Sequence, residues 1–267
     1  MSDWKGLIFR IPLLRNRGGV SAPLSMPDGA LEWWYAGDGL SANSTLTTSG
    51  DGQPVSAWAG ETSVVSVTNT DAARPTYRQS VAELNGRGAV EFNGTSQYLS
   101  AAVAQSLSAN LASYLKFVVF RTTAGSANGG FLYGESRSSS DTPLHGMSAN
   151  RTTAGDVGLL VRGDAASPLW NGSTAQGAND GAAHLFVLQR ISAASWRILL
   201  DGVEVAANAS ANVGATTIDR ISIGALVRTT VGAYFSGQIA CVADYPGDAN
   251  LDLITYTLMT YYGIPDS

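Results

Sequence analysis

The 267-residue chain has few of the residues on which catalytic and metal sites usually depend. It contains one cysteine and two histidines, which excludes an intrachain disulfide and a histidine-rich metal cage. Cys241 lies in the apolar stretch Gln238–Val242, so we expect a small core residue and not a reactive thiol. No nucleophile motif accompanies His184, so we expect it to line or cap the start of a strand.

Charge is also scarce, since charged residues make up 14% of the chain and the net charge is −5. The basic residues form no run, which makes nucleic acid a poor partner. Apolar runs are too short for a membrane span, and the N-terminal stretch lacks the apolar region of a signal peptide. We therefore expect no membrane span, no signal peptide and synthesis in the cytoplasm.

Hydrophobic residues account for 45% of the chain, which is ample for a core, and the 30 glycines indicate many turns. Short apolar or alternating runs bounded by turn residues predict strands. The turns include Asn85-Gly86, Asn93-Gly94 and Asp201-Gly202. The clearest predicted strands cover residues 31–36, 89–92, 114–121, 184–191, 195–200, 203–205, 219–224 and 234–240.

The last segment changes its period, with apolar residues at 251, 254, 258 and 261, and this spacing predicts one helix. Asp248 is expected to cap its start and Gly263 its end. About a dozen strands, one helix and no linker predict a single all-β domain over residues 31–267, built as a two-sheet antiparallel sandwich.

Residues 1–30 differ from the rest because prolines and paired glycines interrupt any regular element. We read them as an extended arm for attachment or assembly. Its apolar residues need a covering surface on this domain or on a neighbouring subunit; they are Leu7, Ile8, Phe9, Leu13 and Leu14. A first strand of the sandwich followed by a loop explains the same pattern equally well.

Several segments, in this order, resemble the laminin-G-like jelly roll of the concanavalin A-like lectin/glucanase superfamily. They are residues 34–39, 55–58, 74–77, 85–94, 184–187, 198–202, 221–224, 235–240 and 261–264. The resemblance implies a jelly-roll sandwich over residues 31–264. Within that superfamily, a short arm and a lysine-poor composition are similar to virion proteins of tailed bacteriophages.

That resemblance implies a structural component of a phage particle, associated with the tail or fibre and located in the virion. Its partners would be other virion proteins, reached through the arm, and further copies of the chain in a homo-oligomer. The jelly roll would bind a glycan of the bacterial surface. A capsid decoration protein without a ligand and a glycoside hydrolase of the same superfamily are the alternatives.

A hydrolase of this superfamily would use paired carboxylates, which on one strand lie two or four residues apart. No such pair occurs, and the six glutamates are far apart in sequence. We therefore expect no catalytic residues and no enzyme, with carboxylates paired across strands as the remaining route to activity.

Sugar binding favours an exposed aromatic ring beside polar side chains. Two groups fit that description: Trp170 and Asn171 with Asp164, and Tyr133 with Arg137 and Asp141. For Trp170, packing against the edge of the sandwich is the competing interpretation.

We expect no cofactor. Loops with Asp156, Asp164 and Asp180 could gather carboxylates around calcium at one end of the sandwich, but their spacing matches no defined calcium loop. Solvated turn residues are the favoured interpretation, and the metal content is left open.

Overall fold

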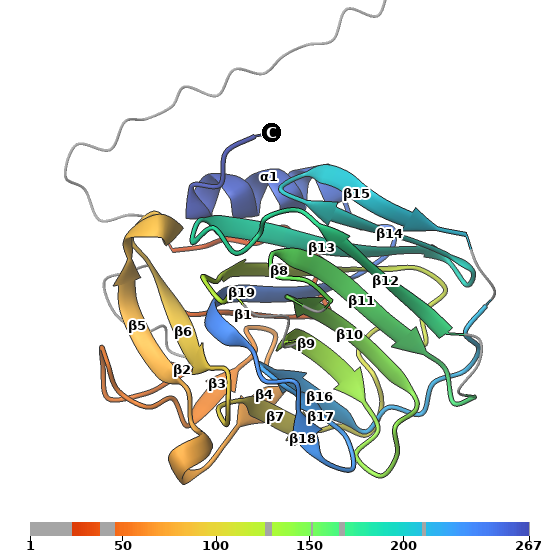
Figure 1. Ribbon diagram of the computed structural model, residues 1–267, viewed down its shortest axis with the longest axis horizontal. Helices are drawn as coiled ribbons and strands as arrows, with labels where there is room; N and C mark the ends of the chain where they lie inside the picture. The colour runs from red at the N-terminus through yellow and green to blue at the C-terminus, as the bar shows by residue number, and fades with distance from the viewer. Residues whose placement is uncertain are drawn as a thin grey trace, which may run out of the picture.

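The computed structural model describes residues 23–37, 46–125, 130–150, 152–165, 169–209 and 212–266, without the side chains of Asp71, Leu169, Trp170, Asn171 and Ser173. Two antiparallel sheets face each other, and one α-helix lies near the C-terminus. Figure 1 shows one sheet in front of the other and the helix along the top. The predicted all-β sandwich with a C-terminal helix is confirmed.

Sheet A has eight strands within the described residues, in the order β15-β14-β13-β8-β19-β6-β5, and β1 also pairs with β19. The last strand in the sequence, β19, lies in the middle of this sheet. It pairs with β8 on one side and with β6 and β1 on the other. The bounds are β1 (Glu32–Tyr35), β5 (Thr76–Val81), β6 (Arg87–Asn93), β8 (Tyr114–Arg121), β13 (Ala183–Ser192), β14 (Ser195–Leu200), β15 (Val203–Asn208) and β19 (Ser236–Pro246).

Sheet B has nine strands in the described part of the chain, in the order β12-β11-β10-β9-β16-β7-β4-β3-β2. Their bounds are β2 (Leu46–Thr47), β3 (Ala57–Ala59), β4 (Ser66–Thr68), β7 (Leu99–Ala102), β9 (Gly130–Ser136), β10 (Leu144–Ala149), β11 (Asp156–Arg162), β12 (Leu169–Ala175) and β16 (Arg220–Ile223). A small hairpin of β17 (Leu226–Val227) and β18 (Val231–Gly232) lies beside β16 and β9. Two 3-10 turns, η1 (Asp71–Ala73) and η2 (Ala82–Leu84), flank β5.

Most of the core lies in two layers, one between the sheets and one outside sheet A. On β8, Val118 and Phe120 face the inter-sheet layer, whereas Phe117 and Val119 face the outer one. Because both faces of β8 are covered, its side chains are apolar with almost no alternation. Cys241 is buried in the outer layer, which confirms the prediction that it is a core residue.

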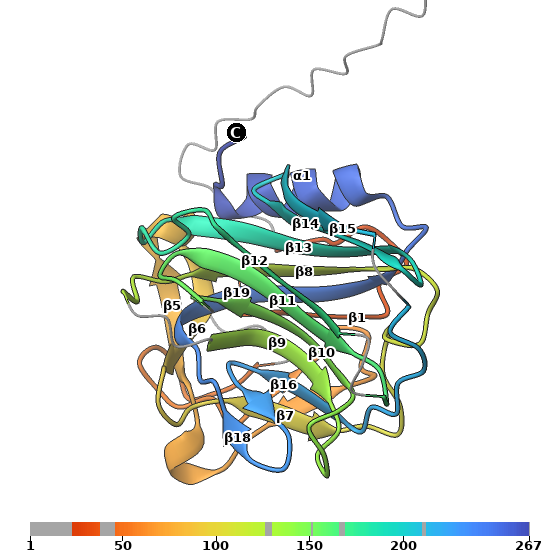
Figure 2. The same cartoon turned by 45° about the vertical axis from the view of Figure 1, so that its right-hand side comes forward.

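Helix α1 (Leu251–Tyr262) covers the outer face of sheet A and lies along β13 (Figure 2). Its end is as predicted, with Gly263 in the left-handed conformation at φ 70°. The predicted cap at Asp248 is wrong. Asn250 caps the helix instead, accepting a hydrogen bond from the Leu253 N–H at 3.0 Å, because it immediately precedes the first helical residue.

The arm residues Leu7, Ile8, Phe9, Leu13 and Leu14 lie outside the described residues. The last part of the predicted arm packs on the domain: Leu24 is buried in the layer outside sheet A, and the Tyr245 hydroxyl donates to the Pro27 carbonyl at 2.8 Å. Within the described ranges, no helix is both long and apolar enough to cross a membrane.

Candidate functional site

A buried ionic cluster joins the two sheets. The Lys116 Nζ on β8 donates to the carboxylates of Glu135 on β9 and Asp244 on β19. Lys116 and Asp244 are register partners in sheet A, and Glu135 reaches them from sheet B. Each of the three side chains is at most 1% exposed. The charges therefore interact with one another and not with water.

Residues 103–113, here called the plug, connect β7 to β8 and cover this cluster. The Ser106 hydroxyl donates to Glu135, and the Ser108 hydroxyl donates to the Asp244 Oδ2 at 3.0 Å. The Arg190 Nη1 anchors the plug by donating to the Ala109 carbonyl at 3.0 Å. The plug thus supplies a hydrogen bond to each carboxyl group and closes them in, although the Asp244 Oδ1 is buried without a hydrogen-bond partner in the described structure.

The two carboxyl groups respond differently to this environment. Burial raises the pKa of the Asp244 carboxyl to about 7, despite the attraction of Lys116. Burial opposes the ionisation of Glu135 too, but the charge and hydrogen bond of Lys116 outweigh it and hold its pKa below the usual value. One lysine neutralises one carboxylate, so Glu135 takes the ion pair and Asp244 retains a proton near neutral pH.

In glycoside hydrolases, two adjacent carboxyl groups with different pKa values act as the catalytic acid and base. Here they are enclosed between the sheets, and they hold Lys116 instead of presenting an atom to a substrate. The sequence signal for this cluster was Lys116 itself. A lysine in the middle of an apolar strand cannot stay charged without a carboxylate partner.

Arginines gather at a different place, on the outer face of sheet B. Direct pairing across four strands places Arg162 of β11, Leu144 of β10, Ser136 of β9 and Arg220 of β16 in one transverse row. Paired residues of antiparallel strands share a face. Three strand spacings separate the two arginines, which is about 14 Å between their backbones.

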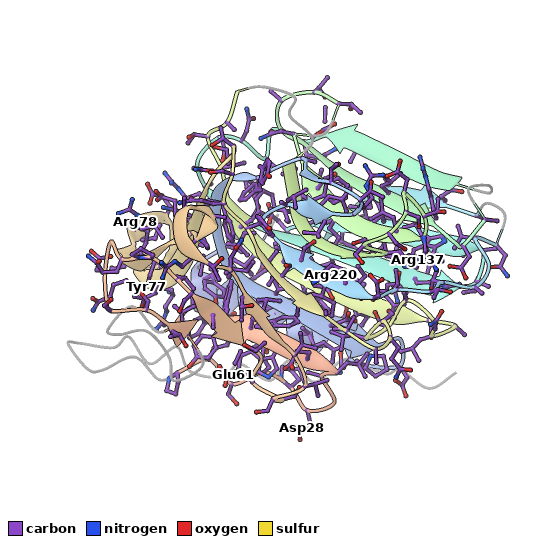
Figure 3. The ribbon with its side chains drawn as sticks, turned by 90° about the horizontal axis from the view of Figure 1, so that it is seen from below. Asp28, Glu61, Tyr77, Arg78, Arg137 and Arg220 are labelled. Carbon is purple, nitrogen blue, oxygen red and sulfur yellow. The ribbon has the colours of Figure 1, made fainter. Side chains whose placement is uncertain are left out.

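Arg137 follows β9 directly, and Figure 3 shows it in the same part of the molecule as Arg220. We call Arg137, Arg162 and Arg220 the arginine end. All three side chains are partly buried. Among the described residues none of them has an ion-pair partner, and the Nε atoms of Arg162 and Arg220 are buried without a hydrogen-bond partner. These are unsatisfied cationic donors within reach of solvent.

The middle of the same face is filled by protein. The Phe131 ring lies over Gly146, where an added Cβ would be 2.1 Å from a ring carbon. Leu226 of the β17–β18 hairpin packs with Phe131, and the hairpin carbonyl of Val227 accepts from the Ser136 hydroxyl. The arginines therefore stand at the rim of a filled face and not over an open groove.

The predicted glycan residues fall into separate places. Tyr133 lies fully buried between the sheets, with its hydroxyl donating to the Glu135 Oε1 at 3.2 Å, so it offers no exposed ring for stacking. Its position on β9 faces the core, and this corrects its expected exposure. Trp170 and Asn171 lie on β12, where their backbones pair with β11, and their side chains are outside what the structure describes.

The other three predicted residues lie near the arginine end. Arg137 begins the loop after β9, and Asp141 in the same loop pairs with Arg228 at 3.2 Å. The Thr142 hydroxyl ties that loop to the backbone carbonyl of Asp164 at 3.3 Å. Arg137, Asp141 and Asp164 therefore lie in one region of the surface, although the sequence placed Asp164 in one predicted glycan-binding group and Arg137 and Asp141 in the other.

The aspartates considered for calcium are used in separate turns. Asp156 accepts from the backbone N–H groups of Thr152 and Thr153, and Asp164 accepts from the Thr217 N–H at 2.7 Å. Asp180 accepts from a turn N–H and faces His184 at the start of β13. The described residues contain no group of three or more His, Cys, Asp or Glu side chains able to hold a metal ion.

A hollow of about 530 Å³ opens where β4 and β7 diverge after a single pairing at Thr68 and Ser100. It lies outside the plug, whose residues Ser106 and Leu107 form part of its wall. Its described lining has no aromatic or charged side chain. A sugar would find neither a stacking surface nor an ionic partner there.

No protein-family model matches the chain, and no curated protein sequence matches it. Solved structures do resemble it. The CBM40 of Ruminococcus gnavus IT-sialidase bound to alpha2,6 sialyllactose is 15% identical, with a TM-score of 0.50 over 64% of this chain and 96% of that one. Domain 4 of AbnA, a GH43 extracellular arabinanase from Geobacillus stearothermophilus in complex with arabinotriose, is 14% identical, with a TM-score of 0.51 over 71% and 84%.

A third match is the leech intramolecular trans-sialidase complexed with 2,7-anhydro-Neu5Ac, at 12% identity and a TM-score of 0.51. That match covers 67% of this chain but only 27% of the leech enzyme. At such identities the likeness concerns the fold alone, and it agrees with the β-sandwich described above.

Proposed function

We propose that this protein is a non-catalytic, lectin-like module that binds an acidic glycan at the arginine end. The observation that carries the proposal is the set of three partly buried arginines, Arg137, Arg162 and Arg220, which have no ion-pair partner among the described residues. They occur in a chain whose net charge is −5, so a general attraction for anions does not explain them.

Guanidinium groups suit a carboxylate ligand because their planar donors match its two oxygens. The unpaired Nε atoms of Arg162 and Arg220 are buried, and an unsatisfied buried donor is unfavourable. A ligand carboxylate or hydroxyl that accepts from them removes that penalty. Partial burial also strengthens the attraction relative to a fully exposed arginine.

The fold neighbours support a sugar as the ligand. The R. gnavus module is described with sialyllactose, which carries a carboxylate, and the arabinanase domain with arabinotriose. Binding at the arginine end predicts that this chain prefers the acidic sugar of the two. Asp164 and Asp141 in the same neighbourhood supply acceptors for sugar hydroxyls.

The non-catalytic part of the proposal rests on the enclosure of Glu135 and Asp244. The hydrolase alternative requires a substrate to reach these carboxyl groups, and Ser106 and Ser108 of the plug occupy their open side. Incubation with acidic and neutral oligosaccharides, followed by a reducing-sugar assay, tests it. Release of sugar that is abolished by Glu135→Gln would establish the hydrolase instead.

Binding is tested by calorimetric titration of the full chain with 3′-sialyllactose and with lactose. We expect binding of the acidic sugar only, weakened in the double variant Arg162→Gln/Arg220→Gln by about tenfold to a hundredfold, the range for hydrogen bonds to charged groups. Arg197→Gln is the matched control, since Arg197 lies in sheet A and pairs with Glu204. Equal binding of lactose, or an unaffected double variant, would contradict the arginine end as the site.

The proposal extends to a tailed-bacteriophage particle, where residues 1–30 would attach the module to tail or fibre proteins as a homo-oligomer. The sequence resemblance alone supports this part, with capsid decoration as its alternative. Mass spectrometry of purified tails and capsids tests the location, and light scattering of the full chain tests the oligomer. If the protein is a monomer and is absent from every particle fraction, the proposed location in the virion is wrong. The glycan-binding proposal would still stand.

A further inference from the structure

The outer side of α1 borders a second hollow, here called the helix groove, of about 280 Å³. One wall is the turn between β14 and β15, with Asp201 and Val203, and the other is α1, with Asp252, Tyr256 and Met259. Asp266, beyond the helix, closes one end. The groove lies on the opposite side of sheet A from the arginine end.

The helix groove combines acidic and apolar character. Tyr256 is 56% exposed and Val203 is 46% exposed, so each presents apolar surface to solvent. Asp201 already binds His184 and the Leu185 N–H, but Asp252 and Asp266 have no ion-pair partner among the described residues. The described residues that line the groove include no lysine or arginine. A segment that is both apolar and cationic is the complementary occupant.

The chain contains such a segment in residues 4–17. Four of its 16 basic residues fall within residues 1–22, whereas only one acidic residue, Asp3, lies there. The basic residues are Lys5, Arg10, Arg15 and Arg17, and they alternate with the apolar run 7–9 and with Ile11, Leu13 and Leu14. We infer that residues 4–17 dock in the helix groove of the same molecule.

The described chain starts close enough for this. Leu24 packs in the same layer outside sheet A as Met259 and Tyr262 of α1. Residues 18–22 span up to about 17 Å when extended, and a helix with its side chains is about 10–12 Å across. Residues 4–17 can therefore cross α1 and reach the groove. Attachment to the same chain gives them a high effective concentration there.

Docking makes the arm and the groove a single unit in the free protein. A virion partner that takes up the arm must compete with Asp252 and Asp266 for its basic residues. The inference does not depend on glycan binding, because the groove and the arginine end lie on different sheets.

Zero-length carbodiimide cross-linking of the full chain tests the docking. The chain has two lysines, and Lys116 is buried, so the side-chain amine available for reaction is that of Lys5. Its ε-amine forms an amide with an activated carboxyl group and releases the activated oxygen as a urea. We expect mass spectrometry to find Lys5 joined to Asp252 or Asp266.

The variant Asp252→Asn/Asp266→Asn should lower the total yield of Lys5 cross-links and expose Arg10, Arg15 and Arg17 to trypsin at least about fivefold faster, given the strength of partly exposed ion pairs. Asp51→Asn is the matched control. Its carboxylate accepts from the Gln79 N–H, which an amide oxygen can replace, and it lies away from α1.

Mixing isotope-labelled and unlabelled protein before the reaction identifies the partner. Cross-links that join only two labelled or two unlabelled peptides confirm docking in the same molecule. Cross-links that join a labelled peptide to an unlabelled one overturn it in favour of docking on a second copy. Cross-links of Lys5 only to acids outside the groove, or no protection of the three arginines from trypsin, overturn the groove as the site.

Discussion

The molecule holds two sets of charged side chains that differ in one respect, whether their charge is compensated. In the ionic cluster, Lys116 lies between two carboxyl groups and the plug covers all three. At the arginine end, Arg162 and Arg220 are partly buried and unpaired in the described structure. The first set resembles a catalytic site by composition, and the second does not.

The difference shows that composition is a weaker guide to function than access. A buried charge that is paired and enclosed is out of reach of a ligand, and it contributes by fixing how the sheets meet. An arginine without a partner near the surface keeps N–H groups that can donate hydrogen bonds to a ligand. The predictions below separate these two roles by their effect on stability, from the largest to the smallest.

Lys116→Met should have the largest effect, a loss of about 3–5 kcal/mol in the free energy of unfolding. It leaves Glu135 and Asp244 buried together without a cation. Chemical denaturation at pH 7 measures the loss. The triple variant Lys116→Met/Glu135→Gln/Asp244→Asn removes all three charges and should recover most of the stability. A triple variant as unstable as the single one would show that packing around Lys116, and not its charge, is what matters.

The Asp244 carboxyl should make stability depend on pH. Its pKa is raised by burial to about 7, above the usual value of a carboxyl group, so the folded state keeps a proton that the unfolded state releases. This contribution is complete below about pH 4 and is lost as the pH rises to about 7, at up to about 1.4 kcal/mol per pH unit.

Asp244→Asn should abolish this component, because the amide does not titrate. Unfolding curves measured at pH 4.5, 6 and 8 give the comparison, with Asp51→Asn as control. If the Asn variant and the original chain lose stability in parallel over this range, another group is responsible.

Ser106→Ala should cost about 1–3 kcal/mol, since it removes a donor to Glu135 and an acceptor for the Ala109 N–H at 2.5 Å. The plug should also open more often, which amide hydrogen exchange over residues 103–113 would detect. Ser66→Ala, an exposed residue in the hollow beside the plug, serves as control. If the amides of residues 103–113 exchange equally fast in both variants, the hydrogen bonds of Ser106 do not hold the plug closed.

Arg162→Gln and Arg220→Gln should have the smallest effect on stability, within about 0.5 kcal/mol, because neither side chain has an ion-pair partner within the described residues. Their effect should appear in glycan binding alone. Thermal unfolding with and without 3′-sialyllactose measures both quantities in one experiment. A loss of several kcal/mol without ligand would place these arginines among the structural charges.

Local patterns were enough to predict much of the fold. The bounds of β8 and α1 follow from runs that contain their own turn or cap signals, such as Gly263. The sequence underestimated β19, which continues to Pro246 instead of ending at residue 240. Its extension includes Asp244, a polar residue that only the pairing with Lys116 makes compatible with a buried strand.

The sites were harder to predict because their residues meet only through the sheet pairing. Lys116 and Asp244 are 128 residues apart in the chain. Arg162 and Arg220 share a row only because β10 and β9 lie between their strands. Tyr133 was placed wrongly as an exposed ring because every residue of β9 is buried, so alternation gave no indication of which side faced the core.

The position of β19 affects how the protein folds while it is being synthesised. The ribosome makes residues 236–246 after every other strand of sheet A, yet they form its centre. Until then β8 and β6 each lack a neighbour on one side, and β1 has no strand to pair with. A nascent chain therefore exposes open, apolar strand edges, which are prone to pair with other chains. Synthesis of β19, and not the appearance of the first strands, is the event that permits this domain to close.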